Sequence, residues 1–259
     1  MDLGLEGKVA LVAGASRGIG AAIATALGRE GCRLVVCARG GERLQGAAAA
    51  IARETGTEVL AVAEDVTATG SGERLVAAAR ERFGRLDLVV HNAGGNRRGA
   101  LVETTDEAWR EIFELNVLAG VRLARAAVPE LRRQSGAAIL FVASIFGREA
   151  GGPGLSIYNA TKSALISAAK ILALELAPEG IRVNSIAPGS IRFPGSSWDE
   201  RCKKEPEAMA EFLRRNLPMG RFGSAEEIAD VAAFLCSARA GWITGACLNV
   251  DGGQSRSLI

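Results

Sequence analysis

Short apolar runs alternate along the chain with longer segments of helical periodicity. Seven of these runs have the length and composition of strands, at residues 8–13, 33–38, 58–63, 86–91, 137–144, 181–187 and 246–250. Because each run is apolar throughout rather than alternating, both faces of the sheet must be covered. The pattern predicts an α/β fold with a doubly wound, parallel, seven-stranded sheet flanked by helices.

No internal boundary divides the chain. Of its 259 residues, 48% are hydrophobic and 23% charged, which is enough apolar material for one large core. There is no linker-like stretch, charge block or repeat with a period of tens of residues. We therefore predict a single domain over residues 1–259.

Charge and cysteine usage exclude several classes of protein. The 31 basic and 29 acidic residues are interspersed, without a basic stripe carrying aromatic residues, so a nucleic acid partner is not expected. The least charged stretch, residues 134–147, is too short for a membrane span, and the acidic start does not resemble a signal peptide. Five cysteines without a CxxC spacing favour reduced thiols and no metal site. A cytoplasmic protein is the expectation.

A glycine-rich turn follows the first strand. The stretch GASRGIG places Gly14, Gly18 and Gly20 where a strand passes into a helix. Glycines let the backbone approach a pyrophosphate, and a helix N-terminus attracts the phosphate charge. Glycines in such turns also have purely steric uses, so this spacing alone leaves a dinucleotide site undecided.

Arginines occupy the position that distinguishes the two nicotinamide dinucleotides. At the end of the second strand, where an NAD-binding fold carries an acidic residue, this chain has Arg39, and Arg17 lies inside the glycine loop. Two guanidinium groups converging there suit a ribose 2′-phosphate. The pair favours NADP(H) over NAD(H), although Arg39 alone is also typical of a solvated loop.

The only tyrosine, Tyr158, begins a helical pattern that brings Lys162 onto the same face one turn later. A phenol has an ordinary pKa of ~10, and a neighbouring ammonium lowers it. Ser144, at the end of the fifth strand, could donate to the same substrate oxygen. Singly these are ordinary surface or capping residues, but with a nucleotide loop they predict a catalytic site. A hydrolase is disfavoured, because Ser144 lacks a GxSxG context and the only histidine, His91, ends another strand.

Taken together, these motifs resemble the short-chain dehydrogenase/reductase family. GxxxGxG at 14–20, HNAG at 91–94, Ser144 and YxxxK at 158–162 match it, and the likeness runs from about residue 6 to the VDGG near the C-terminus. Within the family, the chain resembles 3-oxoacyl-acyl carrier protein reductase-like members. It implies a Rossmann-fold oxidoreductase that transfers hydride between a nicotinamide and a ketone or secondary alcohol.

The resemblance also implies roles for individual residues. Tyr158 would be the acid and base, Ser144 would orient the substrate oxygen, and Lys162 would lower the tyrosine pKa and bind the nicotinamide ribose. Asn116 would hold a water that links the lysine to solvent, although such an asparagine also kinks or caps helices.

Asp65 would contact adenine or would cap a helix. The full set of implied cofactor contacts is Gly14, Ser16, Arg17, Gly18, Ile19, Gly20, Arg39, Asp65, Val66, Asn92, Ala93, Gly94, Tyr158, Lys162, Pro188, Gly189 and Ile191.

Three positions depart from the family pattern. His91 replaces an asparagine, and we expect it to be a packed residue rather than a catalyst. Phe193 replaces a threonine that bonds the carboxamide, which leaves that contact to Ser190 or to backbone. Leu174 stands where reductases of carrier-bound 3-oxoacyl groups tend to have arginine, which weakens acyl carrier protein as a partner.

Residues 190–217 follow the sixth strand with a loop and a helical pattern, where a substrate lid is expected. Apolar residues there could form a wall with Ile145 and Phe146, or only the inner face of the lid: Phe193, Trp198, Met209 and Phe212. The substrate would be a 3-oxoacyl thioester or a medium-sized apolar ketone.

The apolar helical patterns at 105–131 and 155–177 predict self-association, and the family implies a homotetramer. A non-catalytic dinucleotide-binding or scaffold protein is the alternative.

Overall fold

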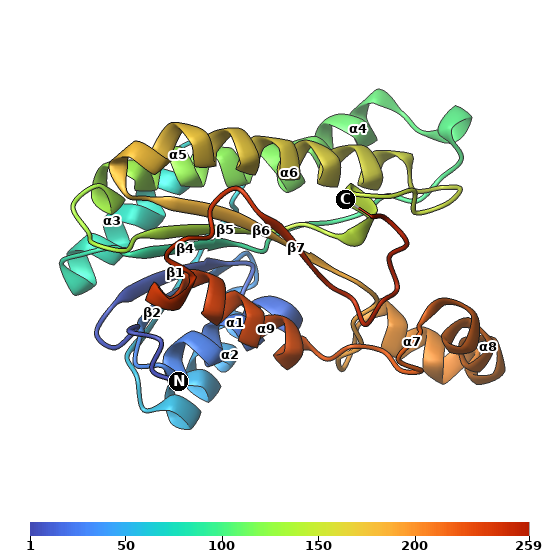
Figure 1. Cartoon of the computed structure of the whole chain (residues 1–259), viewed down its shortest axis with the longest axis horizontal. Helices are drawn as coiled ribbons and strands as arrows, with labels where there is room; N and C mark the ends of the chain where they lie inside the picture. Colours follow the sequence, from blue (N-terminus) through green and yellow to red (C-terminus); the bar gives the residue numbers. More distant parts are fainter. Residues whose placement is uncertain (259) are drawn as a thin grey trace.

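A parallel sheet of seven strands runs through the centre of the computed structural model, which describes residues 1–258 (Figure 1). The strands are β1 (Val9–Ala13), β2 (Arg33–Ala38), β3 (Val59–Ala63), β4 (Leu88–His91), β5 (Ala138–Val142), β6 (Arg182–Pro188) and β7 (Cys247–Val250). Their spatial order is β3-β2-β1-β4-β5-β6-β7, with every neighbouring pair parallel. The predicted seven-stranded α/β fold is confirmed.

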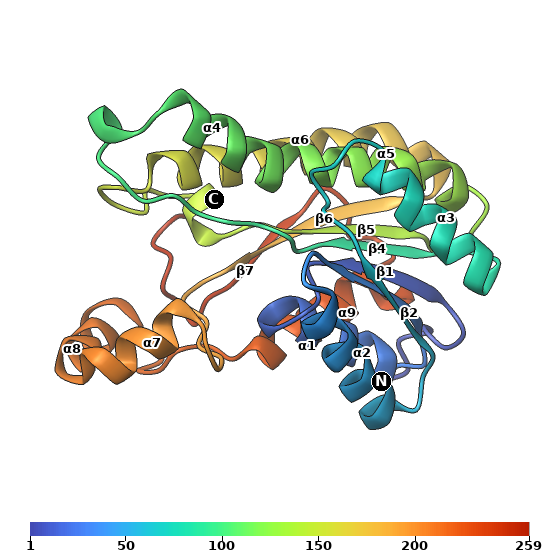
Figure 2. The same cartoon turned by 180° about the vertical axis from the view of Figure 1, so that it is seen from behind.

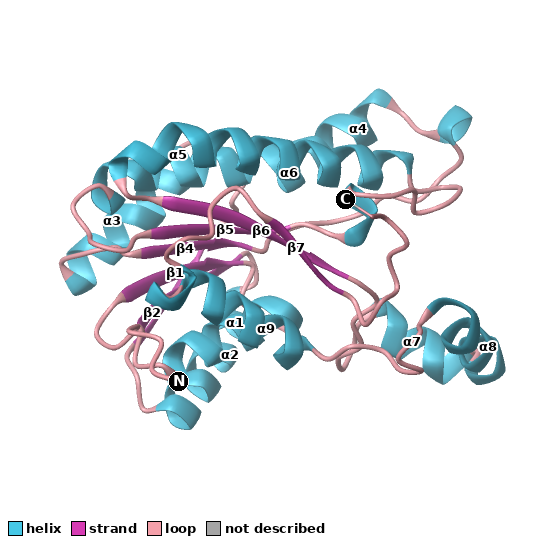
Figure 3. Ribbon diagram, in the orientation of Figure 1, coloured by secondary structure: helices cyan, strands magenta, loops and turns pink. Residues whose placement is uncertain are grey.

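Helices cover both faces of the sheet (Figure 3). One layer holds α1 (Gly18–Arg29), α2 (Gly41–Thr55) and α9 (Ala225–Cys236); the other holds α3 (Ser71–Phe83), α4 (Asp106–Phe113), α5 (Ala119–Leu131) and α6 (Ser156–Leu176). The order of the strands reverses between the neighbours β1 and β4: β1 to β3 extend toward one edge of the sheet, and β4 to β7 extend toward the other. Ligands of such folds bind at the carboxyl ends of the strands beside this reversal.

Successive residues of β1 serve two separate cores. Ala10 and Val12 pack in the core beneath α1, α2 and α9, whereas Val9 and Leu11 pack in the core beneath α3, α5 and α6. All four are fully buried. Because side chains of a strand alternate between faces, a strand covered on both sides must be apolar at every position. This explains the continuous runs in the sequence.

Two short helices between β6 and α9 stand away from the sheet (Figures 1 and 2). They are α7 (Ser197–Lys204) and α8 (Pro206–Asn216), so the predicted lid segment holds two helices rather than one. The Ser196 hydroxyl caps α7 by accepting from the Asp199 amide at 3.1 Å. The rings of Trp198 and Phe212 stack with centroids 4.7 Å apart.

All five cysteines are free, and Cys32, Cys37 and Cys236 are buried. Across residues 1–258 no helix is both long enough and apolar enough to cross a membrane. The same residues contain no cluster of three or more histidine, cysteine or acidic side chains arranged to hold a metal ion.

Candidate active site

The glycine loop has a backbone shape that side chains would disturb. Gly14 and Gly18 adopt left-handed φ angles of 84° and 56°. A Cβ on Gly20 would lie 2.2 Å from the Gly14 carbonyl oxygen. Helix α1 then starts at Gly18 with no side chain capping its amides and no acidic residue in its first turn. Its N-terminus therefore presents unpaired N–H groups to an anion.

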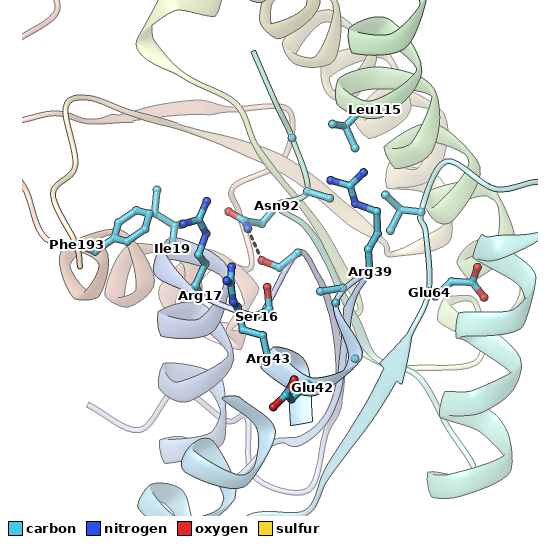
Figure 4. Close-up of a pocket in the computed structure, with 17 residues that line it drawn as sticks. Ser16, Arg17, Ile19, Arg39, Glu42, Arg43, Glu64, Asn92, Leu115 and Phe193 are labelled. Carbon is cyan, nitrogen blue, oxygen red and sulfur yellow. Dashed lines mark hydrogen bonds between the residues drawn. The ribbon is translucent and has the colours of Figure 1, made fainter. Parts of the chain in front are cut away.

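Beside this loop lies a cavity of about 800 Å³ (Figure 4). Its floor is closed by Asn92, whose side-chain amide donates to the Gly14 carbonyl at 2.8 Å. The predicted cofactor residues that line it are Gly14, Ser16, Arg17, Ile19, Arg39, Val66, Asn92, Ala93 and Gly94. A volume of this size is in the range of pockets for extended ligands.

The predicted convergence of Arg17 and Arg39 is not seen. The Arg17 guanidinium donates to the carbonyl of Gly195 at 3.1 Å, because the segment before α7 passes over the glycine loop. Arg39 lies on the opposite side of the cavity, below Leu115 (Figure 4), and its charge contributes to lowering the Asp65 pKa. Both remain at the cavity, and a single exposed hydrogen bond holds Arg17 in this position.

Sequence reasoning missed one arginine of this cavity. Arg43, in the first turn of α2, lines it together with Glu42 and Glu64. Figure 4 shows Arg43 on the same side as Ser16 and Arg17. The available signal was its place in the first turn of the helix that follows the second strand. The start of that helix lies next to the carboxyl end of the strand, where ligands bind in such sheets.

Asp65 closes the turn that follows β3 and does not cap a helix, because α3 begins at Ser71 with Gly70 at its N-cap. Its carboxylate accepts hydrogen bonds from the Thr67 amide at 2.9 Å and the Thr67 hydroxyl at 2.7 Å. These bonds lower the Asp65 pKa. Its neighbour Val66, rather than Asp65, lines the cavity.

Tyr158, Ser144 and Lys162 come together at the end of β5. Ser144 follows the strand and caps a short 3-10 turn, accepting from the Phe146 amide at 3.2 Å. Tyr158 projects from the first turn of α6. Burial raises the pKa of the Tyr158 phenol, and its hydrogen bond with Ser144 opposes that rise. The phenol is therefore protonated at neutral pH.

Lys162 is a buried cation. Its ammonium donates to the Val142 carbonyl at 2.9 Å and lies 5.8 Å from the centre of the Tyr158 ring. Desolvation lowers the pKa of Lys162 to about 8. Lowering of the tyrosine pKa by this ammonium stays a prediction, because the net shift of the phenol in the structure is upward.

Asn116 connects this cluster to the cavity. Its side-chain oxygen accepts from the Gly95 amide at 2.8 Å, and its amide donates to the Gly95 carbonyl and to Thr161, both at 3.0 Å. The residue is fully buried in a π-helical turn, Glu114–Leu118, between α4 and α5. Such turns interrupt the regular helical hydrogen bonds and often occur at functional sites. The asparagine side chain thus clamps the segment that follows β4.

The turn after β6 lies beside the glycine loop. Pro188 ends β6, and Ile191 forms an isolated bridge with Gly223. Phe193 covers the loop so closely that a Cβ on Gly18 would lie 2.4 Å from its ring. The aromatic wall anticipated from the sequence is therefore divided, since Phe193 is on the glycine loop while Trp198 and Phe212 pack together in the lid.

His91 is packed, as expected. It is 1% exposed, meets Phe141 edge to face, and lies against Gly120, where a Cβ would come within 2.7 Å of the ring. Burial lowers the pKa of His91 to about 3, so the ring is neutral at physiological pH.

A family model described as enoyl-(acyl carrier protein) reductase matches residues 14–255. The chain belongs to the short-chain dehydrogenase/reductase family. Dehydrogenase/reductase SDR family member 4 from Sus scrofa is 38% identical over 257 residues, covering 98% of this chain and 89% of that protein. An uncharacterized oxidoreductase of Methylorubrum extorquens is 40% identical over 249 residues, covering 96% and 98%.

Solved structures of similar proteins agree with this assignment. L-Sorbose reductase from Gluconobacter frateurii, in a complex with NADPH and L-sorbose, superposes with a TM-score of 0.94 and 39% identity over the full length of both chains. A dehydrogenase/reductase structure from Sinorhizobium meliloti has a TM-score of 0.90 and 32% identity, covering 99% of this chain and 98% of that chain.

Proposed function

We propose that the protein is an NADP(H)-dependent oxidoreductase that transfers hydride between the nicotinamide and a ketone or secondary alcohol. The observation that carries this proposal is the cluster at the end of β5. A protonated phenol, Tyr158, hydrogen-bonds with Ser144 beside the buried ammonium of Lys162. A Cβ on Gly94, which lines the dinucleotide cavity, would lie 3.4 Å from that ammonium.

The cavity residues fit a dinucleotide. The N–H groups at the start of α1 would bind the pyrophosphate, and Asn92, Ala93 and Gly94 would line the adenine ribose. The nicotinamide would then reach the end of β5, near Lys162 and the turn formed by Pro188, Gly189 and Ile191. When bound, the cofactor supplies or accepts the hydride.

Side chains of the protein would carry out the proton transfer. In the direction of reduction, the Tyr158 hydroxyl donates its proton to the carbonyl oxygen, and the Ser144 hydroxyl donates a hydrogen bond to the same atom. Lys162, whose ammonium is predominantly charged at pH 7, stabilises the phenolate that this transfer leaves. Asn116 acts on this site by holding Gly95 and Thr161 in place.

The Tyr158→Phe variant tests the catalytic role. Phenylalanine keeps the ring and removes only the proton donor, so we expect turnover to fall by about 10²–10⁴-fold. NADPH binding, measured by quenching of tryptophan fluorescence, is expected to stay unchanged and so reports an intact cofactor site. Near-normal turnover in this variant would contradict the proposed role. Tight NADPH binding with no turnover by the wild type on any carbonyl would favour the non-catalytic alternative.

Three arginines support NADP(H) over NAD(H). Arg17, Arg39 and Arg43 all line the cavity, and the L-sorbose reductase that this chain resembles binds NADPH. Arg17 would exchange the Gly195 carbonyl for a phosphate oxygen, which is a stronger acceptor. Parallel titrations with NADPH and NADH test this, with Arg43→Ala compared against Arg53→Ala, an exposed position at the far end of the same helix. Equal affinities for the two cofactors would contradict the phosphate site.

The substrate proposal rests on the lid. Trp198 and Phe212 give it an aromatic interior, which suits a 3-oxoacyl thioester or a medium-sized apolar ketone. L-Sorbose belongs in the same panel of carbonyls, because the similar structure holds that ketose. Acyl carrier protein stays a weaker proposal, since Leu174 is 62% exposed where a basic residue would suit an acidic partner.

A homotetramer is proposed from two separate exposed apolar patches. Phe113, Ile171 and Leu174 are 39%, 53% and 62% exposed on the α4–α6 side. Trp242 and Leu248 are 101% and 42% exposed around β7. Two distinct surfaces that each pair with the same surface of another copy would generate a tetramer. Light scattering of the purified protein tests this, and fluorescence of a tagged protein in cells tests the cytoplasmic location proposed from the sequence.

A further inference from the structure

The C-terminal segment crosses between two walls of the proposed substrate site. In Figures 1 and 2 it leaves β7, passes the base of α7, and turns back toward α6. We call residues 251–257 the C-terminal strap. Its contacts with both neighbouring segments indicate what it does.

One end of the strap is fixed to the turn after β6. The Gln254 side-chain oxygen accepts from the Ser190 amide at 2.7 Å, and Ser190 is 6% exposed. The strap lies so close to Gly189 that a Cβ there would come within 2.7 Å of Asp251. Ser190 begins the segment that leads into α7, so this contact sets where the lid starts.

The other end is fixed to the loop that follows the catalytic serine. A single oxygen of Glu149 accepts from the Ser255 hydroxyl at 3.1 Å, the Arg256 amide at 2.8 Å and the Ser257 amide at 3.2 Å. Hydrogen bonds to a carboxylate are stronger than those between neutral groups. Asp251 shapes the strap for this contact by accepting from the Ser255 amide at 2.8 Å.

Glu149 also touches the neighbour of the proposed acid. Its carbonyl accepts from the Asn159 side chain at 2.7 Å, and the Asn159 oxygen accepts from the Gly151 amide at 3.3 Å. Asn159 directly follows Tyr158. One residue therefore joins the strap, the glycine-rich loop at 151–154 and the helix turn that carries the phenol.

We propose that the C-terminal strap sets the width of the substrate site, with Glu149 as a positioning residue. The strap holds the lid segment at Ser190 at a fixed distance from the loop after Ser144. The predicted effect on KM rests on the proposed function, whereas the contacts of the strap do not depend on it. Glu149 does not line the dinucleotide cavity, and it holds the part of the strap that lies beyond the contacts with Gly189 and Ser190, so its loss should change cofactor affinity less than it changes KM.

The Glu149→Ala variant tests the proposal. Loss of the anchor should raise KM for the ketone by about tenfold, with kcat reduced less, because a loosened wall positions substrate poorly. The Kd for NADPH should rise much less than KM, because the contacts of the strap with Gly189 and Ser190 remain. Glu149→Gln keeps an oxygen that can accept the same bonds and should restore most of KM. Glu81→Ala, at an exposed position in α3, is the matched control and should behave as wild type.

A second measurement needs no substrate. Hydrogen–deuterium exchange of peptides spanning residues 145–155 and 189–196 should become faster in Glu149→Ala and return to the wild-type rate in Glu149→Gln. Gln254→Ala releases the other end and should speed exchange of 189–196, which keeps the test open if Glu149→Ala folds poorly. If the wild type reduces no ketone, the exchange rates alone test whether the strap holds these two segments in place.

An unchanged KM in a wild-type-active preparation would overturn the positioning role, even with faster exchange. Unchanged exchange in both variants would overturn the strap itself. Neither result would touch the role of Tyr158, which its own phenylalanine variant decides. A rise in the Kd for NADPH equal to the rise in KM would also overturn the proposal, because it would place the effect in the cofactor site.

Discussion

Replacing Lys162 with methionine should show how much stability the folded protein loses by burying the lysine charge that the proposed catalytic site uses. The lysine is 4% exposed, and desolvation lowers its pKa from 10.5 to about 8. A lowered pKa for a base means that the folded state disfavours the charged form, so the charge costs stability at every pH below 8. Methionine has similar length and no charge, and it removes this cost along with the proposed catalytic function.

The magnitude follows from the shift. A pKa lowered from 10.5 to about 8 corresponds to a penalty of about 3 kcal/mol well below pH 8, where the lysine is charged in both the folded and the unfolded state. Methionine cannot donate the hydrogen bond to the Val142 carbonyl, and losing that bond costs about 1.5–3 kcal/mol. This loss offsets most of the stability gained by removing the buried charge. At pH 7 the two proteins should therefore have similar stability, or the variant should be slightly more stable. Between pH 7 and pH 10 the lysine loses its proton in the folded state before it does so in the unfolded state, so the wild type should gain about 2–3 kcal/mol of stability relative to the variant.

Urea unfolding at matched protein concentration, over several pH values, measures this difference. Other groups that titrate in the same range are common to both proteins, so their contribution cancels in the comparison. Parallel pH profiles for wild type and Lys162→Met would refute the reasoning, because they would show that the ammonium is not desolvated. A variant several kcal/mol less stable at pH 7 would refute it as well.

Three further predictions test the fold and the cavity. Asp87→Ala leaves the buried Val9 amide without its acceptor and should cost about 2–4 kcal/mol in urea unfolding; a loss below 1 kcal/mol would contradict this. Gly20→Ala should lower both stability and NADPH affinity, whereas Gly46→Ala, with open space at its Cβ, should lower neither; equal effects would be contrary evidence. In native protein an aromatic disulfide reagent should modify only Cys202 and Cys247, because burial raises the pKa of the other three thiols to about 12; a third reactive thiol would refute that.

The strands and the glycine turn were predictable because their causes are local. A strand buried on both faces must be apolar at each position, and this leaves a readable run, as in Val9–Ala13. Gly14 and Gly18 are needed for backbone conformation, which a short motif records. The parallel topology puts Ser144 at the edge of the sheet where ligands bind, whereas Tyr158 lies in the first turn of α6, so its place beside Ser144 was indicated by the sequence motif and not by the strands.

Contacts between distant segments could not be predicted in the same way. The acceptor that holds Arg17 lies 178 residues away in the sequence, and nothing near either residue indicates the pairing. The bonds from Glu149 to the strap span more than a hundred residues, and a glutamate followed by alanine and glycine carries no signal for them. The π-helical turn at Asn116 is likewise invisible to periodicity, because one additional residue per turn changes the apolar pattern only slightly.

That π-helical turn separates the packing of the helix from the placing of one side chain. A π-helical turn holds one residue more than an α-helical turn, so deleting one residue from Glu114–Leu118 would restore a regular helix with little rotation of the part that follows. The face of α5 that buries Leu123, Ala127 and Leu131 would stay against the sheet. The deletion would instead change how the Asn116 side chain is presented to Gly95 and Thr161, so it would alter the candidate site while leaving the core packed.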